Sequence, residues 1–135
     1  MLYTIDDNFL RFWFRFVYRH QSIIELKAYE RLRQFVLRDY KAFSGIALEG
    51  YFRRRLAEEG TWTRIGGWWD RKGEQEIDVV AVDDFDKRVL FAEVKRNADK
   101  INPAVLKAKS EEFLKVNSSY IDYDREYRSL SMSDL

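Results

Sequence analysis

Cysteine is absent from this chain of 135 residues, and histidine and proline each occur once. Without cysteine the chain has no disulfide framework, no thiolate metal site and no cysteine nucleophile. A single histidine argues against a metal site built from several histidines and against a Ser–His catalytic triad. The apolar runs are much shorter than the roughly 20 residues that span a bilayer, and the N-terminus lacks a signal-peptide layout. We therefore expect a cytoplasmic protein without a membrane partner.

Aromatic residues, in contrast, are abundant, with four Trp, eight Tyr and ten Phe in a chain that is 46% hydrophobic. This composition excludes a disordered chain and is sufficient for one folded core. The net charge is only +1, but the stretch from Asn8 to Arg71 contains thirteen Lys and Arg residues and seven acidic residues. From Lys72 onward, eleven basic residues face fourteen acids. The first half could therefore meet a polyanion, which the total charge does not suggest.

The N-terminal region is predicted to be helical, with Asp6 and Asp7 able to cap its first helix. Arg11, Arg15 and Arg19 recur every four residues, and aromatic residues occupy most of the remaining helix surface. Such a helix must be buried in the domain, in a homodimer or against another partner. A further helix is expected up to Ser44-Gly45. We therefore predict a helical extension over residues 1–42 and a main domain over residues 43–135.

The main domain is predicted to begin with an amphipathic helix that Gly60 can terminate. Strands are expected over residues 61–69, 76–83 and 88–96, with Gly73 in the first turn between them. A last helix starts at Asn102-Pro103, a cap followed by the first helical position, and a short strand is expected near the end of the chain. This order predicts an α/β (α+β) fold, in which helices flank a central mixed sheet of three to five strands.

The hairpin from Glu76 to Arg96 places charged residues in the most apolar stretch of the chain. If its turn is centred between Phe85 and Asp86, Asp78 lies opposite Glu93 and Lys95 lies on the same face as Glu93. A divalent cation would turn the repulsion between the two acids into binding, and their hard oxygen ligands suit Mg²⁺ or Mn²⁺. Lys95 could then orient or deprotonate a water for phosphodiester hydrolysis. The alternative is solvated strand ends, with Glu76 and Lys95 as a weak ion pair.

The order of these residues resembles the restriction-endonuclease-like, or PD-(D/E)xK, nuclease superfamily. Asp78 followed by Glu93-Val94-Lys95 on the next strand is similar to its D…(D/E)xK signature, and Glu49 matches the additional acid on the preceding helix. The resemblance covers residues 44–116. It implies a restriction-endonuclease-like core, a catalytic set of Glu49, Asp78, Glu93 and Lys95, metal ligands Asp78 and Glu93, and DNA as substrate.

A second resemblance covers nearly the whole chain. The stretches "YTIDDNFLRFWFRFV", "ALEGYF", "GGWWDRKGEQEIDVVAV" and "SLSMSDL" resemble the C-terminal region of prokaryotic AAA-type ATPases, known as domain of unknown function 234. The chain itself has no G-x-x-x-x-G-K-[ST] phosphate loop. The resemblance therefore implies an ATPase module as a partner of this region. The stretch "GEQEID" has one more residue than the expected "GxEID", which makes Glu76 either an outer ligand or the ion-pair partner of Lys95.

Other charged and aromatic residues have simpler interpretations. Glu49 and Arg53 are spaced as an i,i+4 ion pair, and Lys107 and Lys109 either approach DNA or are solvated. Trp68 and Trp69 are expected in the core rather than as a base-stacking platform.

Two functions follow from the sequence. The first is a metal-dependent DNA endonuclease; the second is a non-catalytic nuclease-like module that binds DNA or docks the ATPase.

Overall fold

Helices come first and a sheet follows in the computed structural model, which describes residues 5–135. Two units are distinguished, the first ending at Ala47 and the second spanning Leu48–Leu135. The long helix α3, Tyr29–Glu58, contributes residues to both. The first four residues of the expected extension lie outside the described residues. Among the helices of residues 5–135, none has the length and apolar character needed to cross a membrane.

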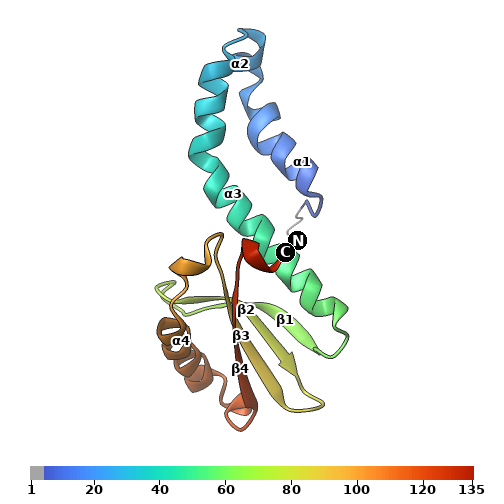
Figure 1. Ribbon diagram of the computed structural model, residues 1–135, viewed down its shortest axis with the longest axis vertical. Helices are drawn as coiled ribbons and strands as arrows, with labels where there is room; N and C mark the ends of the chain where they lie inside the picture. Colours follow the sequence, from blue (N-terminus) through green and yellow to red (C-terminus); the bar gives the residue numbers. More distant parts are fainter. Residues whose placement is uncertain (1–4) are drawn as a thin grey trace. The chain divides into compact units, whose positions relative to one another are not determined.

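The first unit is an irregular helical hairpin. It contains α1 (Asn8–Phe12), a π-helical turn η1 (Trp13–Val17), a 3₁₀ turn η2 (Tyr18–His20), α2 (Gln21–Glu25) and the start of α3 (Figure 1). Asp7 caps α1 by accepting a hydrogen bond from the Leu10 amide at 2.8 Å, as expected. Phe16 is buried, and its ring lies 5.4 Å from that of Phe43 in α3. The aromatic N-terminal segment is thus partly buried within its own unit, while Phe9 stays 72% exposed.

Two expected helix boundaries in this region are wrong. The helix expected through residues 23–43 is interrupted because Lys27 has a φ of 55°, which ends α2. Its amide donates to the Ile24 carbonyl, and the next amide donates to Ile23, which satisfies the helix end without a glycine. Conversely, α3 continues through Ser44-Gly45. Interior glycine costs about 1 kcal/mol in a helix, and packing of Phe43 and Leu48 on either side outweighs that cost.

The second unit is built on a four-stranded sheet in the order β1-β2-β3-β4. The strands are β1 (Arg64–Trp69), β2 (Glu76–Asp83), β3 (Arg88–Val94) and β4 (Asp124–Leu130). The first three strands form an antiparallel meander, whereas β4 is parallel to β3. The chain between these parallel strands contains η3 (Ala98–Lys100), α4 (Pro103–Val116) and η4 (Ser118–Tyr120), and η5 (Met132–Asp134) follows β4. The expected class, a mixed sheet flanked by helices, is confirmed.

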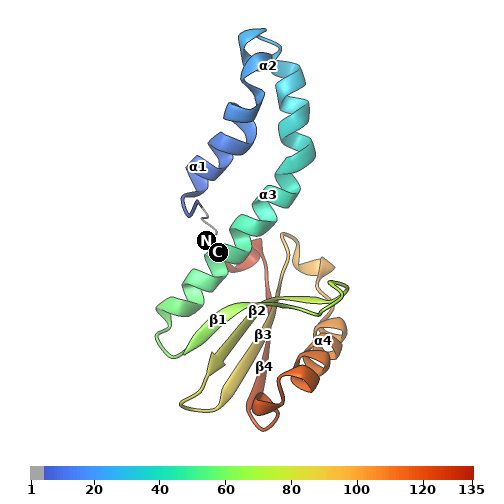
Figure 2. The same cartoon turned by 180° about the vertical axis from the view of Figure 1, so that it is seen from behind.

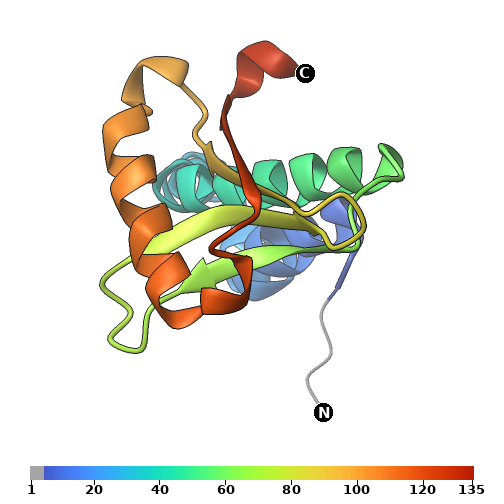
Figure 3. The same ribbon diagram turned by 90° about the horizontal axis from the view of Figure 1, so that it is seen from below.

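Each face of the sheet has its own hydrophobic layer. On one face, Val79 and Ala81 of β2 pack with Leu48, Phe52 and Leu56 of α3. On the other face, Val80 and Val82 pack with residues of α4, namely Leu106, Phe113 and Leu114. The two helices lie on opposite sides of the sheet, as Figures 2 and 3 show. Because both faces of β2 and β3 are buried, these strands read as continuous apolar runs in the sequence.

Several local predictions in the second unit are confirmed, although β1 begins three residues later than expected and β3 ends two residues earlier. Asn102 caps α4 through the Ala104 amide at 3.0 Å, and Gly60 and Gly73 have positive φ values of 73° and 69°. Trp68 packs against Phe113, as expected of a core residue. The prediction that Trp69 lies in the core is wrong, because Trp69 is 72% exposed. Successive side chains of a strand point to opposite sides, so Trp69 does not share the contact of Trp68 with Phe113.

Candidate functional site

The two carboxylates predicted for a metal site lie at the paired ends of β2 and β3. Five pairs, from Val79–Ala92 to Asp83–Arg88, confirm the expected hairpin register. Asp78 and Glu93 occupy the next positions along the two strands, and each is 9% exposed. One oxygen of Asp78, Oδ2, accepts a hydrogen bond of 2.7 Å from the Val94 amide. The side chain of Asp78 therefore reaches directly across to the strand that carries Glu93.

The strand β2 has a β-bulge at Asp78 and Val79. Along β1, Gly66 lies opposite Val80, but Trp68 lies opposite Ile77. Gly67 alone therefore faces two residues of β2, Asp78 and Val79. Bulges bend a strand and redirect its side chains, and they are over-represented next to active sites. The strand that carries the candidate aspartate is thus locally irregular at that residue.

Arg53 of α3 holds the main chain at this bulge. Its Nη2 donates a 2.6 Å hydrogen bond to the carbonyl oxygen of Asp78 and lies 3.9 Å from Oε2 of Glu49. The expected i,i+4 contact between Glu49 and Arg53 is therefore present, but the shorter contact of Arg53 is with β2. The guanidinium passes over Gly67, where a Cβ atom would lie only 2.7 Å from Nη2. Glycine at this position lets the arginine reach the strand.

Glu49 lies on α3 within the electrostatic field of the same acids. Burial raises the pKa of Glu49 above its ordinary value of 4.5, and the charge of Asp78 raises this pKa further. The charges of Arg53 and Lys95 act in the opposite direction on the pKa of Glu49. Glu49 therefore lies within the electrostatic reach of Asp78 and Lys95, and its proton is held more tightly than in water.

Two lysines contact Glu93. The Nζ atom of Lys95 lies 3.6 Å from Oε1 of Glu93, and that of Lys109 in α4 lies 3.4 Å from the same atom. Lys109 is the more enclosed, with 18% of its side chain exposed against 42% for Lys95. Together they compensate the charge of a carboxylate that would be costly to bury alone. Lys107, one of the two lysines expected near DNA, is exposed on α4.

The alternative role predicted for Glu76, an ion pair with Lys95, is not found among residues 5–135. Glu76 is exposed and pairs with Trp69 of β1. Its charge raises the pKa of Glu49, but less than burial and the charge of Asp78 do. Within the same residues, no group of three or more His, Cys, Asp or Glu side chains is arranged to hold a metal ion. Any ion here would therefore rely on fewer protein ligands.

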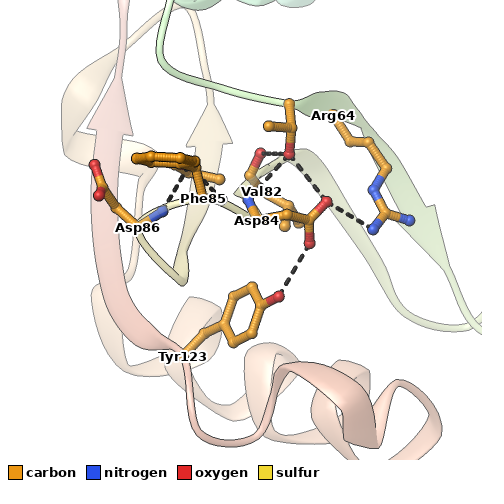
Figure 4. Close-up of polar contacts among 8 residues, drawn as sticks. Arg64, Val82, Asp84, Phe85, Asp86 and Tyr123 are labelled. Atoms are coloured by element: carbon orange, nitrogen blue, oxygen red, sulfur yellow. Dashed lines mark hydrogen bonds and ion pairs between the residues drawn. The ribbon is translucent and has the colours of Figure 1, made fainter.

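A second group of acids, at the other end of the hairpin, has a structural role. Asp83 accepts hydrogen bonds from the amides of Phe85 and Asp86 at 3.0 and 3.1 Å and so fixes the turn. Asp84 accepts from Arg64 at 2.8 Å and from Tyr123 at 3.0 Å, as Figure 4 shows. The hydrogen bond from Arg64 is the main cause that lowers the pKa of Asp84. These satisfied carboxylates tie strands together and differ from the crowded acids around Asp78.

Sequence reasoning missed two residues of the site. It assigned Arg53 to an ion pair with Glu49 and gave Gly67 no role. The signal available was the Gly66-Gly67 pair within a strand, because glycine inside a strand marks a bulge or a close approach of another group. The contact between Lys109 and Glu93 had no local signal, since it depends on the packing of α4 on the sheet.

Comparison with known proteins places the chain in a family without a known activity. Over 100 residues, the chain is 36% identical to an uncharacterized protein of Methanocaldococcus jannaschii. The match covers 69% of this chain but only 22% of that relative. No solved structure matches the chain. The family model DUF234, described as "Archaea bacterial proteins of unknown function", matches residues 13–114, which includes the whole cluster from Glu49 to Lys109. The chain therefore belongs to the DUF234 family.

Proposed function

We propose that the second unit is a metal-dependent DNA endonuclease of the PD-(D/E)xK type. The observation that carries the proposal is the grouping of Asp78, Glu93 and Lys95 at one end of a buried hairpin, with Glu49 approaching from α3. Acids that repel one another are stable in a buried site only when a cation or another charge compensates them. The resemblance of these residues to the nuclease signature supports the same conclusion.

Mg²⁺ or Mn²⁺ fits the donors in this site. Mg²⁺ is commonly held by one or two carboxylates, several waters and substrate phosphates rather than by an all-protein cage. Asp78 and Glu93 supply two buried carboxylates with hard oxygen donors. The Val94 amide binds Oδ2 of Asp78, which leaves Oδ1 to hold an ion. A bound ion would neutralise phosphate charge and lower the pKa of a water.

The basic residues would bind and orient the substrate. Lys109 and Lys95 bring two positive charges to Glu93, and both can donate hydrogen bonds to a phosphate that enters between them. Lys95 is the more exposed of the two and would orient the attacking water. Glu49, with its raised pKa, would act as an auxiliary acid at the edge of the site. Arg53 would keep Asp78 in place through its main-chain carbonyl.

The test combines metal titration calorimetry with cleavage of plasmid and oligonucleotide DNA. Asp78→Ala should abolish Mn²⁺ binding, because it removes one of two close acidic ligands. Lys95→Ala should retain the metal but slow cleavage by about 10²-fold or more, the effect of losing a positioned proton-transfer group. Asp122→Ala is the matched control, because this exposed acid precedes β4, which begins opposite Arg88 at the far end of β3. Wild-type protein that binds neither Mg²⁺ nor Mn²⁺ would contradict the proposal.

The alternative is a non-catalytic module that binds DNA or docks an ATPase. Two observations favour it: Glu93 already has two lysine partners, and residues 5–135 contain no group of three or more potential metal ligands. The chain also spans only 22% of its relative's length, so a larger protein could supply the activity. DNA binding that is unchanged by EDTA, without cleavage or metal binding, would select this module over the nuclease.

A further inference from the structure

A cleft of about 380 Å³ lies between the β1–β2 hairpin and the C-terminal end of α4. Its lining includes the indoles Trp68 and Trp69, the polar residues Arg71, Gln75 and Asn117, and the apolar Val116. Ligand sites typically have volumes of about 300–1,000 Å³ and combine apolar walls with a few polar groups. The cleft therefore has the size and composition of a site for a small planar group.

Trp69 forms an exposed wall on a fixed support. The residue is 72% exposed, whereas its neighbour Trp68 packs edge-on against Phe113 with ring centroids 5.7 Å apart. The following turn is closed by hydrogen bonds from the Asp70 amide to the Gln75 carbonyl and from the Gly73 amide to the Asp70 carbonyl. An exposed indole on an ordered hairpin loses little freedom when a flat ligand stacks on it.

The acids of the cleft are already engaged. Oδ1 of Asp70 accepts from the Glu74 amide at 2.8 Å, and Glu112 pairs with Lys115 at 2.5 Å. Asn117 donates through Nδ2 to the Phe113 carbonyl, which leaves its side-chain oxygen as an acceptor. Arg71 adds an exposed cation. The cleft thus offers an aromatic face, an amide and a positive charge, which together suit a nucleobase and its backbone.

The cleft adjoins the cluster around Asp78. Trp69 pairs with Glu76, which precedes Asp78 by two positions, a distance of about 7 Å along a strand. On α4, Lys109 contacts Glu93 and lies four residues, a rise of about 6 Å, before Phe113, which supports Trp68. A nucleic-acid strand with a phosphate at the lysines would therefore bring a neighbouring base to the cleft.

We propose that this cleft is a stacking subsite in which Trp69 binds an unpaired base of single-stranded DNA. The inference deepens the proposed nuclease function and rests on it for the position of the phosphate. A base in a duplex is stacked on both sides, so it can reach the cleft only after it leaves the helix. The site would therefore favour single strands, flaps or frayed ends over continuous duplex. The phosphate-binding lysines beside the cleft favour this occupant over an apolar peptide.

The experiment measures fluorescence anisotropy of a labelled thymidine octamer, and of a matched blunt duplex, with the full chain in EDTA. Trp69→Ala should weaken binding of the single strand by about 5- to 150-fold, the scale of one base–aromatic stack. Trp69→Phe, which keeps an aromatic face, should restore most of the affinity. Phe85→Ala is the matched control, because Phe85 is 90% exposed but lies in the turn between β2 and β3, at the other end of β2.

Single-strand affinity that is unchanged in Trp69→Ala, or lowered equally in Phe85→Ala, would overturn the stacking subsite. An equal loss of duplex and single-strand binding in Trp69→Ala would also overturn it, because stacking requires an unpaired base. Since EDTA removes divalent ions, these results do not depend on catalysis. If Trp69→Ala loses binding while the wild type neither binds Mn²⁺ nor cleaves DNA, the subsite stands and the nuclease proposal fails.

Discussion

Replacing Gly67 with alanine should destabilise the second unit by displacing Arg53. The new Cβ atom would lie 2.7 Å from Nη2 of Arg53 and 3.3 Å from the Asp78 carbonyl oxygen. The main chain of β2 cannot move away easily, because the side chain of Asp78 is also bound to the Val94 amide. The guanidinium, at the end of a flexible side chain, must move instead. It then loses the 2.6 Å hydrogen bond that joins α3 to the bulge of β2.

The expected change in free energy of unfolding combines two opposing effects. A hydrogen bond from a charged donor contributes about 1.5–3 kcal/mol, and the lower half of that range applies here because 38% of the Arg53 side chain is exposed. Replacing glycine with alanine also stabilises the protein by about 0.4–1 kcal/mol, because alanine restricts the unfolded chain. Gly67→Ala should therefore lower the free energy of unfolding by about 1 kcal/mol.

Urea denaturation followed by circular dichroism, with the four members of a double-mutant cycle, measures this effect. In an Arg53→Ala background the nearest contact is gone, so Gly67→Ala should be neutral or slightly stabilising. Gly66→Ala is the matched control: it lies in the same strand, and a Cβ atom there would meet nothing within 4 Å. If Gly67→Ala costs the same with and without Arg53, the displacement of the guanidinium is not the cause and the reasoning is refuted.

Three further predictions concern charge and capping. Because the pKa of Glu49 is raised in the folded protein, its ionisation opposes folding above pH 4.5. Glu49→Gln should therefore be more stable than wild type at pH 7, and this gain should disappear towards pH 4. A difference in urea midpoints that does not change with pH would contradict this. The folded pKa of Asp84 is lowered, so Asp84→Asn should destabilise the protein above pH 3.8, and the difference should vanish as acid protonates the wild-type residue in circular-dichroism titrations. Asn102→Ala should cost about 1 kcal/mol in thermal unfolding by removing the cap of α4, and Asn102→Asp should restore it.

Some features of this protein were determined by the sequence alone. The hairpin register follows from two apolar runs and the turn between them, and this register alone places Asp78 beside Glu93. The start of α4 was equally predictable, because the Asn102-Pro103 pair combines a side-chain cap with a residue suited to the first helical turn. These features depend on residues that are close in sequence, so local rules suffice for them.

Other features required the tertiary structure. Lys27 ends α2 in a left-handed conformation that its residue type does not favour, and α3 continues through Ser44-Gly45 because packing on either side outweighs glycine's cost. The same holds at the site, where Arg53 reaches the Asp78 carbonyl and Lys109 reaches Glu93 across gaps of 25 and 16 residues in sequence. No local pattern encodes such distances. They are set by how α3 and α4 pack on the two faces of the sheet, because side-chain reach is decided by the spacing of packed layers rather than by sequence separation.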